Sequence, residues 1–292
     1  MPRHGSTSRY VLSLLVALVC LLPAAVSAQE PPAGSSPQTP VQATEPERND
    51  PDVRVDPLQP DFTLAALPTT LRMPARKWAF RVTHRFTRDL GQGDFGDLAS
   101  DLFGIDGGAQ IGLEVRYGLL PGTQIGVHRT SDRATQLFAQ HNFMNERDGR
   151  AFGLDAIATF EGDENLSEHH QSALGVAVSK NVGGRAALYV EPLVVLNANP
   201  FGFGDEHTAM IGVGGRFRVR PSTYLTAEYT PRIAGYSPSA DQISFAIEGR
   251  AGGHLFQINV SNGFGTTFGQ IARGGIDYDQ WFLGFNISRK FF

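Results

Sequence analysis

The chain has 292 residues, of which 25 are basic and 29 are acidic, so its formal net charge is −4. This balance offers no basic footprint for nucleic acid and excludes that class of partner from the prediction. Only 18% of the residues are charged, whereas 33 are glycine and 10% are aromatic, a composition that fits a β-barrel better than a soluble enzyme.

Residues 1–28 have the anatomy of a secretory signal peptide. Arg3 and Arg9 lie in a basic start, the apolar run Val11–Leu22 follows, and small residues up to Ala28 form a cleavage site. The apolar run is too short for a membrane-spanning helix. Cleavage after Ala28 removes Cys20, the single cysteine. The mature chain is therefore predicted to hold neither disulfides nor zinc–thiolate sites.

Residues 29–74 are predicted to form a disordered, Pro-rich periplasmic leader. Proline recurs from Pro31 to Pro74 among polar and acidic residues, and large apolar side chains are scarce before Phe62. Such a segment buries too little apolar surface to offset the entropy lost on ordering. The stretch Phe62–Met73 is more apolar and leaves two interpretations open. The segment is a tether, which its composition favours, or it docks at the base of the barrel or enters the lumen.

Residues 75–292 repeat one unit, a stretch of about ten alternating residues followed by a turn. In the first unit Trp78, Phe80 and Val82 share one face and Arg81 and Arg85 share the other. Successive side chains of a strand point to opposite faces, so each unit is a strand with one apolar face. We count about twelve strands, an even number, as single-chain bacterial barrels have.

The connections between these strands alternate in length. The short ones are Leu119–Gly122, Asn145–Arg150, Asn181–Arg185, Arg220–Ser222 and Gly249–Gly253. The long ones are Arg88–Gly107, Glu161–Gln171, Asn197–His207, Pro231–Asp241 and Gly263–Gln280, and only Thr130–Arg133 departs from the alternation. Membrane barrels have short periplasmic turns and longer outer loops, and hydrocarbon requires a sheet to close on itself. The predicted fold is all-β, a single antiparallel transmembrane β-barrel.

The last strand resembles the signal by which bacterial outer-membrane barrels are recognised for insertion. Phe285, Ile287 and Phe291 share one face, and the chain ends on Phe292, which is one residue out of phase. The predicted location is therefore the cell outer membrane, with Phe292 at the periplasmic end. The predicted partners are outer-membrane lipids and the barrel insertion machinery.

Several stretches also resemble one protein family. They are His84-Arg85-Phe86, residues 107–119 (GGAQIGLEVRYGL), residues 253–262 (GHLFQINVSN) and residues 285–291 (FNISRKF). Together they resemble a family of bacterial outer-membrane β-barrel proteins, the domain of unknown function 5777 family, from about Thr70 to the end of the chain. The resemblance implies a barrel fold and an outer-membrane location, and it implies no substrate and no catalytic residues.

The polar faces of the strands predict a set of charges that face the lumen. They are Arg81, Arg85, Glu114, Arg116, Arg216, Arg218, Glu228 and Glu248. A ring of such charges filters solutes in a narrow pore. Alternatively the charges neutralise one another in pairs, which the cost of an unpaired buried charge favours. On this second interpretation Arg81 and Arg85 neighbour Glu114 across the first hairpin.

The sequence also contains residues typical of two further kinds of site, a metal site and a lipid-hydrolase site. His169 and His170 lie in an acidic loop, but its carboxylates lack the spacing of a calcium loop, so no metal site or other cofactor is predicted. A barrel lipid hydrolase needs Ser, His and Asn or Asp together on the outer wall. His141-Asn142 and either Ser172 or Ser179 are the only suggestive residues, and no Gly-x-Ser-x-Gly elbow is present.

The sequence therefore predicts a small channel or structural barrel without catalysis, for a solute that it does not reveal. The alternative is a plugged barrel that binds a ligand or partner through its outer loops Asp89–Ile105, Asn197–Glu206 and Gly263–Asp279. A barrel lipid hydrolase is the third possibility. A lumen open to water separates the first two.

Overall fold

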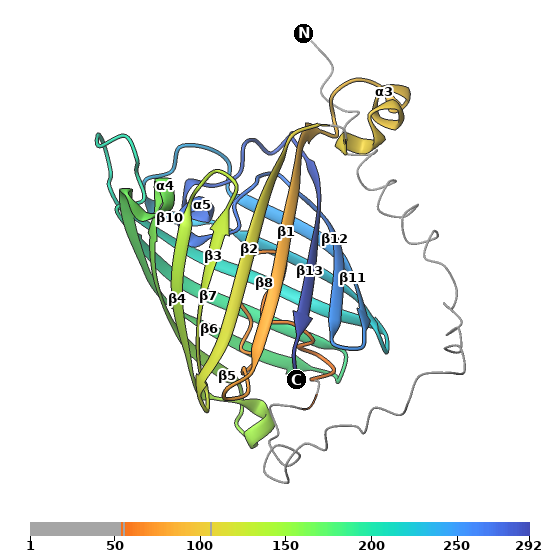
Figure 1. The fold of residues 1–292 in the computed structure, drawn as a ribbon, viewed down its shortest axis with the longest axis vertical. Helices are drawn as coiled ribbons and strands as arrows, with labels where there is room; N and C mark the ends of the chain where they lie inside the picture. Colours follow the sequence, from red (N-terminus) through yellow and green to blue (C-terminus); the bar gives the residue numbers. More distant parts are fainter. Residues whose placement is uncertain (1–53, 55, 106) are drawn as a thin grey trace, which may run out of the picture. The chain divides into compact units, whose positions relative to one another are not determined.

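The computed structural model describes residues 54, 56–105 and 107–292, and its fold is a closed antiparallel β-barrel (Figure 1). The predicted signal peptide and the predicted leader up to residue 53 lie outside the described residues. None of the helices in the described part of the chain is long and apolar enough to cross a membrane. The strands are β1 (Trp78–Asp89), β2 (Ala109–Leu120), β3 (Thr123–Thr130), β4 (Thr135–Met144), β5 (Gly153–Gly162), β6 (Glu168–Val182), β7 (Ala186–Leu196), β8 (Thr208–Arg220), β9 (Thr223–Thr230), β10 (Arg232–Gly235), β11 (Gln242–Ala251), β12 (His254–Ser261) and β13 (Phe282–Lys290).

Apart from the short β10, each strand pairs with its neighbours in sequence, and β1 pairs with β13 to close the sheet. The short β10 continues β9 beyond Pro231 and, like β9, pairs with β8. Proline has no N–H to donate, which explains the interruption. Because β9 and β10 share one position in the wall, the barrel has twelve strand positions, as the sequence predicted.

Most connections follow the predicted alternation, but the β4–β5 connection at the base holds eight residues, 145–152, and β10 lies inside the predicted loop Pro231–Asp241. At the base, where the chain ends, the turns between β2 and β3, β6 and β7, β8 and β9, and β11 and β12 hold two or three residues each. In the β6–β7 turn Gly183 and Gly184 both have positive φ, which fits a tight hairpin. The mouth carries the longer loops, with α3 (Phe95–Ser100) and η2 (Leu102–Gly104) after β1 and α5 (Phe268–Arg273) after β12.

One predicted long loop is mostly strand. The sequence pattern placed a loop over Glu161–Gln171, whereas β5 runs to Gly162 and β6 begins at Glu168. Only the single turn α4 (Asp163–Leu166) and Ser167 connect them. The polar residues at this end pair through backbone hydrogen bonds between β5 and β6, although their composition is typical of a loop.

The two faces of the wall differ as the alternation predicted. Apolar side chains on the outside are exposed, among them Leu113, Leu137, Leu174, Leu188, Phe217 and Phe256, whereas the polar residues between them are buried inside. The inner face of β6, β7 and β8 is an exception that the sequence analysis missed. Ala173, Ala177, Leu193, Val195 and Met210 point inward there and form part of a buried apolar cluster.

The exposed apolar side chains of the outer face predict contact with lipid, in which a charge is costly. Leu174, midway along β6, is 58% exposed on this face. We expect Leu174→Arg to lower the free energy of unfolding in lipid vesicles by about 2–4 kcal/mol, the cost of a charge near the bilayer midplane. Leu119→Arg, on the outer face at the base end of β2, should cost only about 0–1 kcal/mol. Denaturant titrations followed by tryptophan fluorescence measure both, and equal costs would place the wall in water.

Candidate functional site

The lumen is filled from the base by residues Asp56–Met73, named here the lumen hairpin (Figure 1, orange). An antiparallel bridge joins Thr63 to Pro68. The N–H of Leu64 donates to the carbonyl of Leu67 at 2.7 Å, and the N–H of Thr69 donates to the carbonyl of Phe62 at 2.8 Å. The segment therefore enters the barrel, turns at Leu64–Leu67 and returns to the base, where β1 begins.

For residues 56–73 this arrangement corrects the prediction of a disordered leader and of a folded domain that begins at residue 75, and Phe62–Met73 follow the alternative of entry into the lumen. From Asp56 to Met73 almost every described side chain is buried. The prediction from composition treats the segment as an isolated chain in water and does not include the polar barrel wall that surrounds it. Inside the barrel its apolar side chains leave water and its backbone finds partners, so the entropy of ordering is offset.

Glu228 holds the tip of the lumen hairpin. Its Oε2 accepts hydrogen bonds from the N–H groups of Ala65, Ala66 and Leu67, at 3.0, 3.0 and 3.1 Å. These three N–H groups belong to the turn and have no strand beside them to accept their hydrogen bonds. One carboxylate oxygen on β9 accepts all three. Hydrogen bonds to a charged acceptor are the stronger kind, so Glu228 is the main latch of the tip.

The carbonyl groups of the lumen hairpin accept hydrogen bonds from donors all around the wall. These bonds run from Arg216 to Thr63 (2.7 Å), from Gln257 to Leu64 (3.1 Å), from Asn286 to Ala65 (2.9 Å), from Gln140 to Thr69 (2.7 Å), and from Lys290 to Pro60. Side chains from β4, β8, β12 and β13 thus take the place of water around this backbone. The backbone of the hairpin is thus bound by polar side chains of the wall, while three of its leucines pack against Ala187 and Tyr189.

The structure places seven of the eight predicted lumen charges inside the barrel, where each is buried. Glu114 bridges two of them, with its carboxylate 3.7 Å from Arg81 and 2.9 Å from Arg116. The eighth residue, Arg218, lies at the base rim, where it is partly exposed and donates to the carbonyl of Pro221. Arg85 does not pair with Glu114 and donates instead to Asn286 and to the carbonyl of Ala65.

A second ion pair is completely enclosed. Arg216 on β8 and Glu248 on β11 meet at 2.6 Å, and both side chains have no exposed surface. Gln257 on β12 donates to the same carboxylate at 2.7 Å. The pair and its neighbour connect three strands with the lumen hairpin, because Arg216 also donates to Thr63.

Residues Thr266–Ala272, named here the mouth segment, close the lumen from the other end. Phe268, Ile271 and Ala272 are buried in the apolar cluster on the inner face of β6–β8, which also includes Ala66 of the lumen hairpin. Glu161 accepts hydrogen bonds from the Thr267 hydroxyl (2.7 Å) and from the N–H of residue 269 (3.0 Å). The predicted outer loop Gly263–Asp279 is therefore only partly displayed, since its first half fills the barrel.

A hydrogen-bonded cluster fastens the rim beside the mouth segment. Asp241 accepts from the backbone and side chain of Arg232 and from the Tyr229 hydroxyl at 3.0 Å. Partial burial acts to raise the pKa of Asp241, but the hydrogen bonds from Arg232 outweigh burial and hold this pKa below its usual value. Arg232 also donates to the carbonyl of Arg273, which ties the end of α5 to β10.

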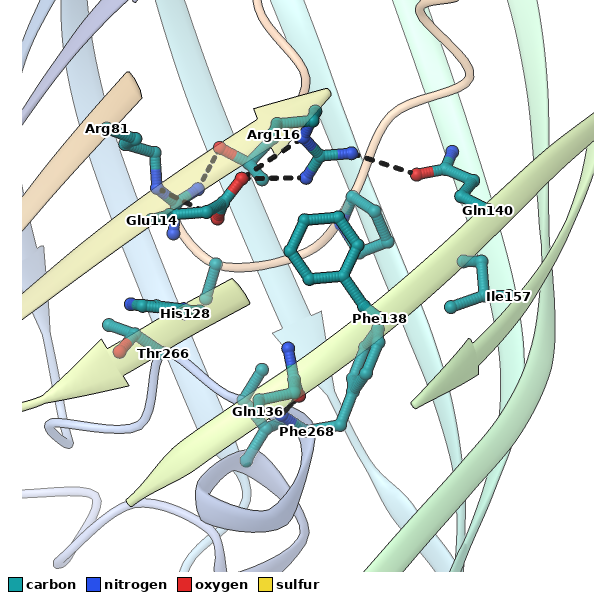
Figure 2. A pocket seen from close by; sticks show the side chains of 14 residues that line it. Arg81, Glu114, Arg116, His128, Gln136, Phe138, Gln140, Ile157, Thr266 and Phe268 are labelled. Carbon is teal, nitrogen blue, oxygen red and sulfur yellow. Dashed lines mark hydrogen bonds and ion pairs between the residues drawn. The ribbon is translucent and has the colours of Figure 1, made fainter. Parts of the chain in front are cut away.

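A cavity of about 30 Å³ remains between the lumen hairpin, the mouth segment and the wall (Figure 2). Arg116 lies between Glu114 and Gln140, and its guanidinium stacks over the ring of Phe138, 4.5 Å from the centroid. The volume is enough for about one or two water molecules. A solute larger than a few water molecules does not fit this cavity.

Several buried polar atoms of the wall have no hydrogen-bond partner among the described residues. They are both carboxylate oxygens of Glu191, the Tyr189 hydroxyl, Gln124 Oε1, His128 Nε2, Asn259 Oδ1 and one guanidinium nitrogen of Arg216. Glu191 on β7 is wholly buried. A buried polar group without a partner lowers stability by about 1–3 kcal/mol. The wall therefore has more hydrogen-bonding groups than the lumen hairpin and the mouth segment, together called the two plugs, can pair with.

The residues considered for a lipid hydrolase are not brought together. His141 is exposed on the outer face and bonds with Thr123, whereas Ser179 points inward and bonds with Thr70. Ser172 is opposite Phe160 on β5, four residues from the partner of His141. Nor do the described residues, His169 and His170 included, form a group of three or more His, Cys, Asp or Glu that could hold a metal.

The residues of the predicted insertion signal divide between the two faces of the wall. Phe285 and Ile287 lie on the outward register of β13, and Phe291, which follows the strand, is exposed. Phe292 points the other way and packs against Phe62, Leu71 and Met73 of the lumen hairpin, with Ala79.

Neither Glu191 nor the mouth segment is among the predicted site residues, and entry of Phe62–Met73 into the lumen is only one of two alternatives that the sequence leaves open. A signal for the last two is visible in β7, where AALYVEPLVVL is apolar on both faces. A strand that is apolar on both faces is covered on both faces, so the lumen had to contain an apolar filling.

Comparisons with known proteins agree with this architecture. The sequence model of a family described as "Membrane bound beta barrel domain (DUF5777)" matches residues 61–291, so the match begins within the lumen hairpin. No curated protein matches the chain.

Solved structures with a similar chain trace include the NanC porin in a rhombohedral crystal form, with 8% identity, 73% of this chain and 98% of that chain covered, and a TM-score of 0.49. The COG4313 outer membrane channel from Pseudomonas putida F1 has 12% identity, 75% and 97% coverage and a TM-score of 0.44. The family match spans most of the chain, and the protein therefore belongs to the DUF5777 family of membrane-bound β-barrel domains.

Proposed function

We propose that this barrel is a non-catalytic solute channel of the bacterial outer membrane whose resting state is closed by the lumen hairpin. One observation carries the proposal, namely the polar wall behind the hairpin. Donors and acceptors line the lumen from β1 to β13, and several are buried without a partner when the hairpin is seated. A permanent filling favours apolar packing, whereas a wall that water wets when the hairpin leaves regains these hydrogen bonds.

The path of the hairpin supports its reversible release. Both ends lie at the base, where Tyr224 donates to the carbonyl of Pro57 and Asn145 donates to the carbonyl of Thr70. The segment can therefore leave through the base without threading past the mouth. Individual hydrogen bonds of this kind contribute about 0.5–1.5 kcal/mol each, so the seated state is stable but not fixed.

The outer face and the final strand support the location. The exposed apolar belt fits outer-membrane lipids as the surrounding partner. The outward Phe285 and Ile287 of β13 and the exposed Phe291 offer the barrel insertion machinery an apolar edge. Both partners and the outer-membrane location are part of this proposal.

A second candidate function is a binding platform. The outer loops expose Phe95 (68%), Phe201 (65%) and Phe203 (75%) at the mouth. Exposed aromatic groups suit contacts with a partner, and a barrel that stays closed would still present them. The two functions differ in whether any ion passes through the lumen.

A disulfide lock tests the channel. The Thr70 and Ser179 hydroxyls are 2.5 Å apart, one on the hairpin and one on β6. A chain expressed from Gln29 contains no other cysteine, so T70C/S179C joins the hairpin to the wall by a single bond. We expect step currents from wild type in planar bilayers, none from the oxidised double variant, and currents again after reduction.

The single variants T70C and S179C are the controls and should conduct like wild type under both conditions. Currents that persist in the oxidised lock would mean that the hairpin does not close the pathway. No current from wild type, from the reduced lock or from a Glu228→Gln variant, which loses the charge that holds the hairpin tip, would reject the channel and leave the platform.

A further inference from the structure

The charges of the lumen are segregated across the barrel. The buried charged residues of β13, β1 and β2 are four basic ones and one acidic one, namely Lys290, Arg81, Arg85, Arg116 and Glu114. The buried charged residues of β5, β6 and β7 are all acidic, namely Asp155, Glu161 and Glu191. Twelve strand positions place β7 six positions from β1, on the opposite side of the barrel. A basic wall thus faces an acidic wall.

The two plugs already match this polarity. On the basic wall the hairpin presents oxygens, since the carboxylate of Asp61 accepts from Ser288, the carbonyl of Pro60 accepts from Lys290, and the carbonyl of Ala65 accepts from Arg85. On the acidic wall the mouth segment presents donors, the hydroxyl of Thr267 and the N–H of residue 269, to Glu161. Each wall is therefore met by groups of the complementary kind.

Glu191 is a residue of the acidic wall to which neither plug donates a hydrogen bond. It has no exposed surface, and neither carboxylate oxygen has a hydrogen-bond partner among the described residues. Leu67 of the hairpin packs against the neighbouring backbone of β8 and supplies no donor there. A buried carboxyl group requires a donor, a cation or a bound proton, and a solute that enters when the hairpin leaves can provide a donor or a cation.

We infer that the channel takes small zwitterionic solutes, which carry a carboxylate toward Arg81, Arg85 and Lys290 and a cationic nitrogen toward Glu191. This inference rests on the proposed channel and names the class of solute that passes through it. The electric field between the two walls orients a zwitterion so that both of its charges are attracted. An anion or a cation is attracted by only one wall and repelled by the other.

Uptake into proteoliposomes tests the inference with the full mature chain. The vesicles are phosphatidylcholine, the protein is the reduced T70C/S179C variant, and the probes are glycine betaine, choline and isethionate, which are small and permanently zwitterionic, cationic and anionic. We expect glycine betaine to enter about fivefold faster than either ion, the ratio that one modest charge contact provides. The oxidised lock gives the background rate for each probe.

Two variants locate the preference. Glu191→Gln keeps the shape of the side chain and removes its charge, so the preference for glycine betaine over isethionate should disappear. Lys290→Gln should remove the preference over choline, and Glu206→Gln, on an exposed mouth loop, should change neither ratio. Equal uptake of the three probes alongside normal ionic currents would overturn the inference and leave the channel intact. Absence of all currents would reject the channel and this inference with it.

Discussion

Replacing Glu228 by Gln should open the channel. The substitution removes the charge from the single oxygen that accepts the N–H groups of Ala65, Ala66 and Leu67. Losing a charged acceptor costs about 1.5–3 kcal/mol, and this cost falls on the seated hairpin alone. The fraction of time that the channel is open should therefore rise by roughly 10- to 150-fold.

Two measurements check this result. Single-channel recording gives the open fraction directly. Chymotrypsin added at the base should cut after Phe62 in the variant and spare wild type, because Phe62 is 4% exposed when the hairpin is seated. Glu206→Gln serves as the matched control, since it neutralises an exposed glutamate far from the hairpin tip. Unchanged currents and unchanged cleavage in Glu228→Gln would show that the tip is not latched at this residue.

The enclosed ion pair should give the largest loss of stability. Glu248→Ala leaves the guanidinium of Arg216 buried without its carboxylate, and both side chains are at 0% exposure. Breaking a buried pair on one side typically costs about 3–5 kcal/mol. We expect a decrease of that size in the free energy of unfolding, measured by denaturant titration with the fluorescence of Trp78 and Trp281.

The double variant R216M/E248L is the control for this effect. Replacing both members with apolar residues leaves no buried charge, and such replacements are often close to neutral. The double variant should therefore be more stable than Glu248→Ala, although it loses the hydrogen bond to Thr63. A double variant that is less stable than the single one would mean that the pair contributes net stability and not only a cost of desolvation.

The wall of this barrel was predictable from the sequence, and the contents of its lumen were not. Alternation of Trp78, Phe80 and Val82 with Arg81 and Arg85 needs only the two-residue period of a strand, so it assigned faces and gave the strand positions. Loop lengths then distinguished the mouth from the base. Both inferences use contacts between residues that are close in sequence or on adjacent strands.

The hairpin and the mouth segment depend on contacts that no local pattern encodes. Composition makes Phe62–Met73 apolar enough to dock but names no partner, and the partners Glu228, Gln257 and Asn286 are about two hundred residues away. Thr267 and Gln270 form a capping box that starts α5, a local signal that was available. What it could not show is that the helix turns into the barrel toward Glu161.

Phe292 lies beneath the lumen hairpin, and the hairpin takes its hydrogen bonds from strands at both ends of the chain. Its seat does not exist until β13 has joined β1 and the ring is complete. The part of the folded unit that leaves the ribosome first is consequently the last to become ordered. Assembly of this protein finishes, as well as begins, at its amino-terminal side.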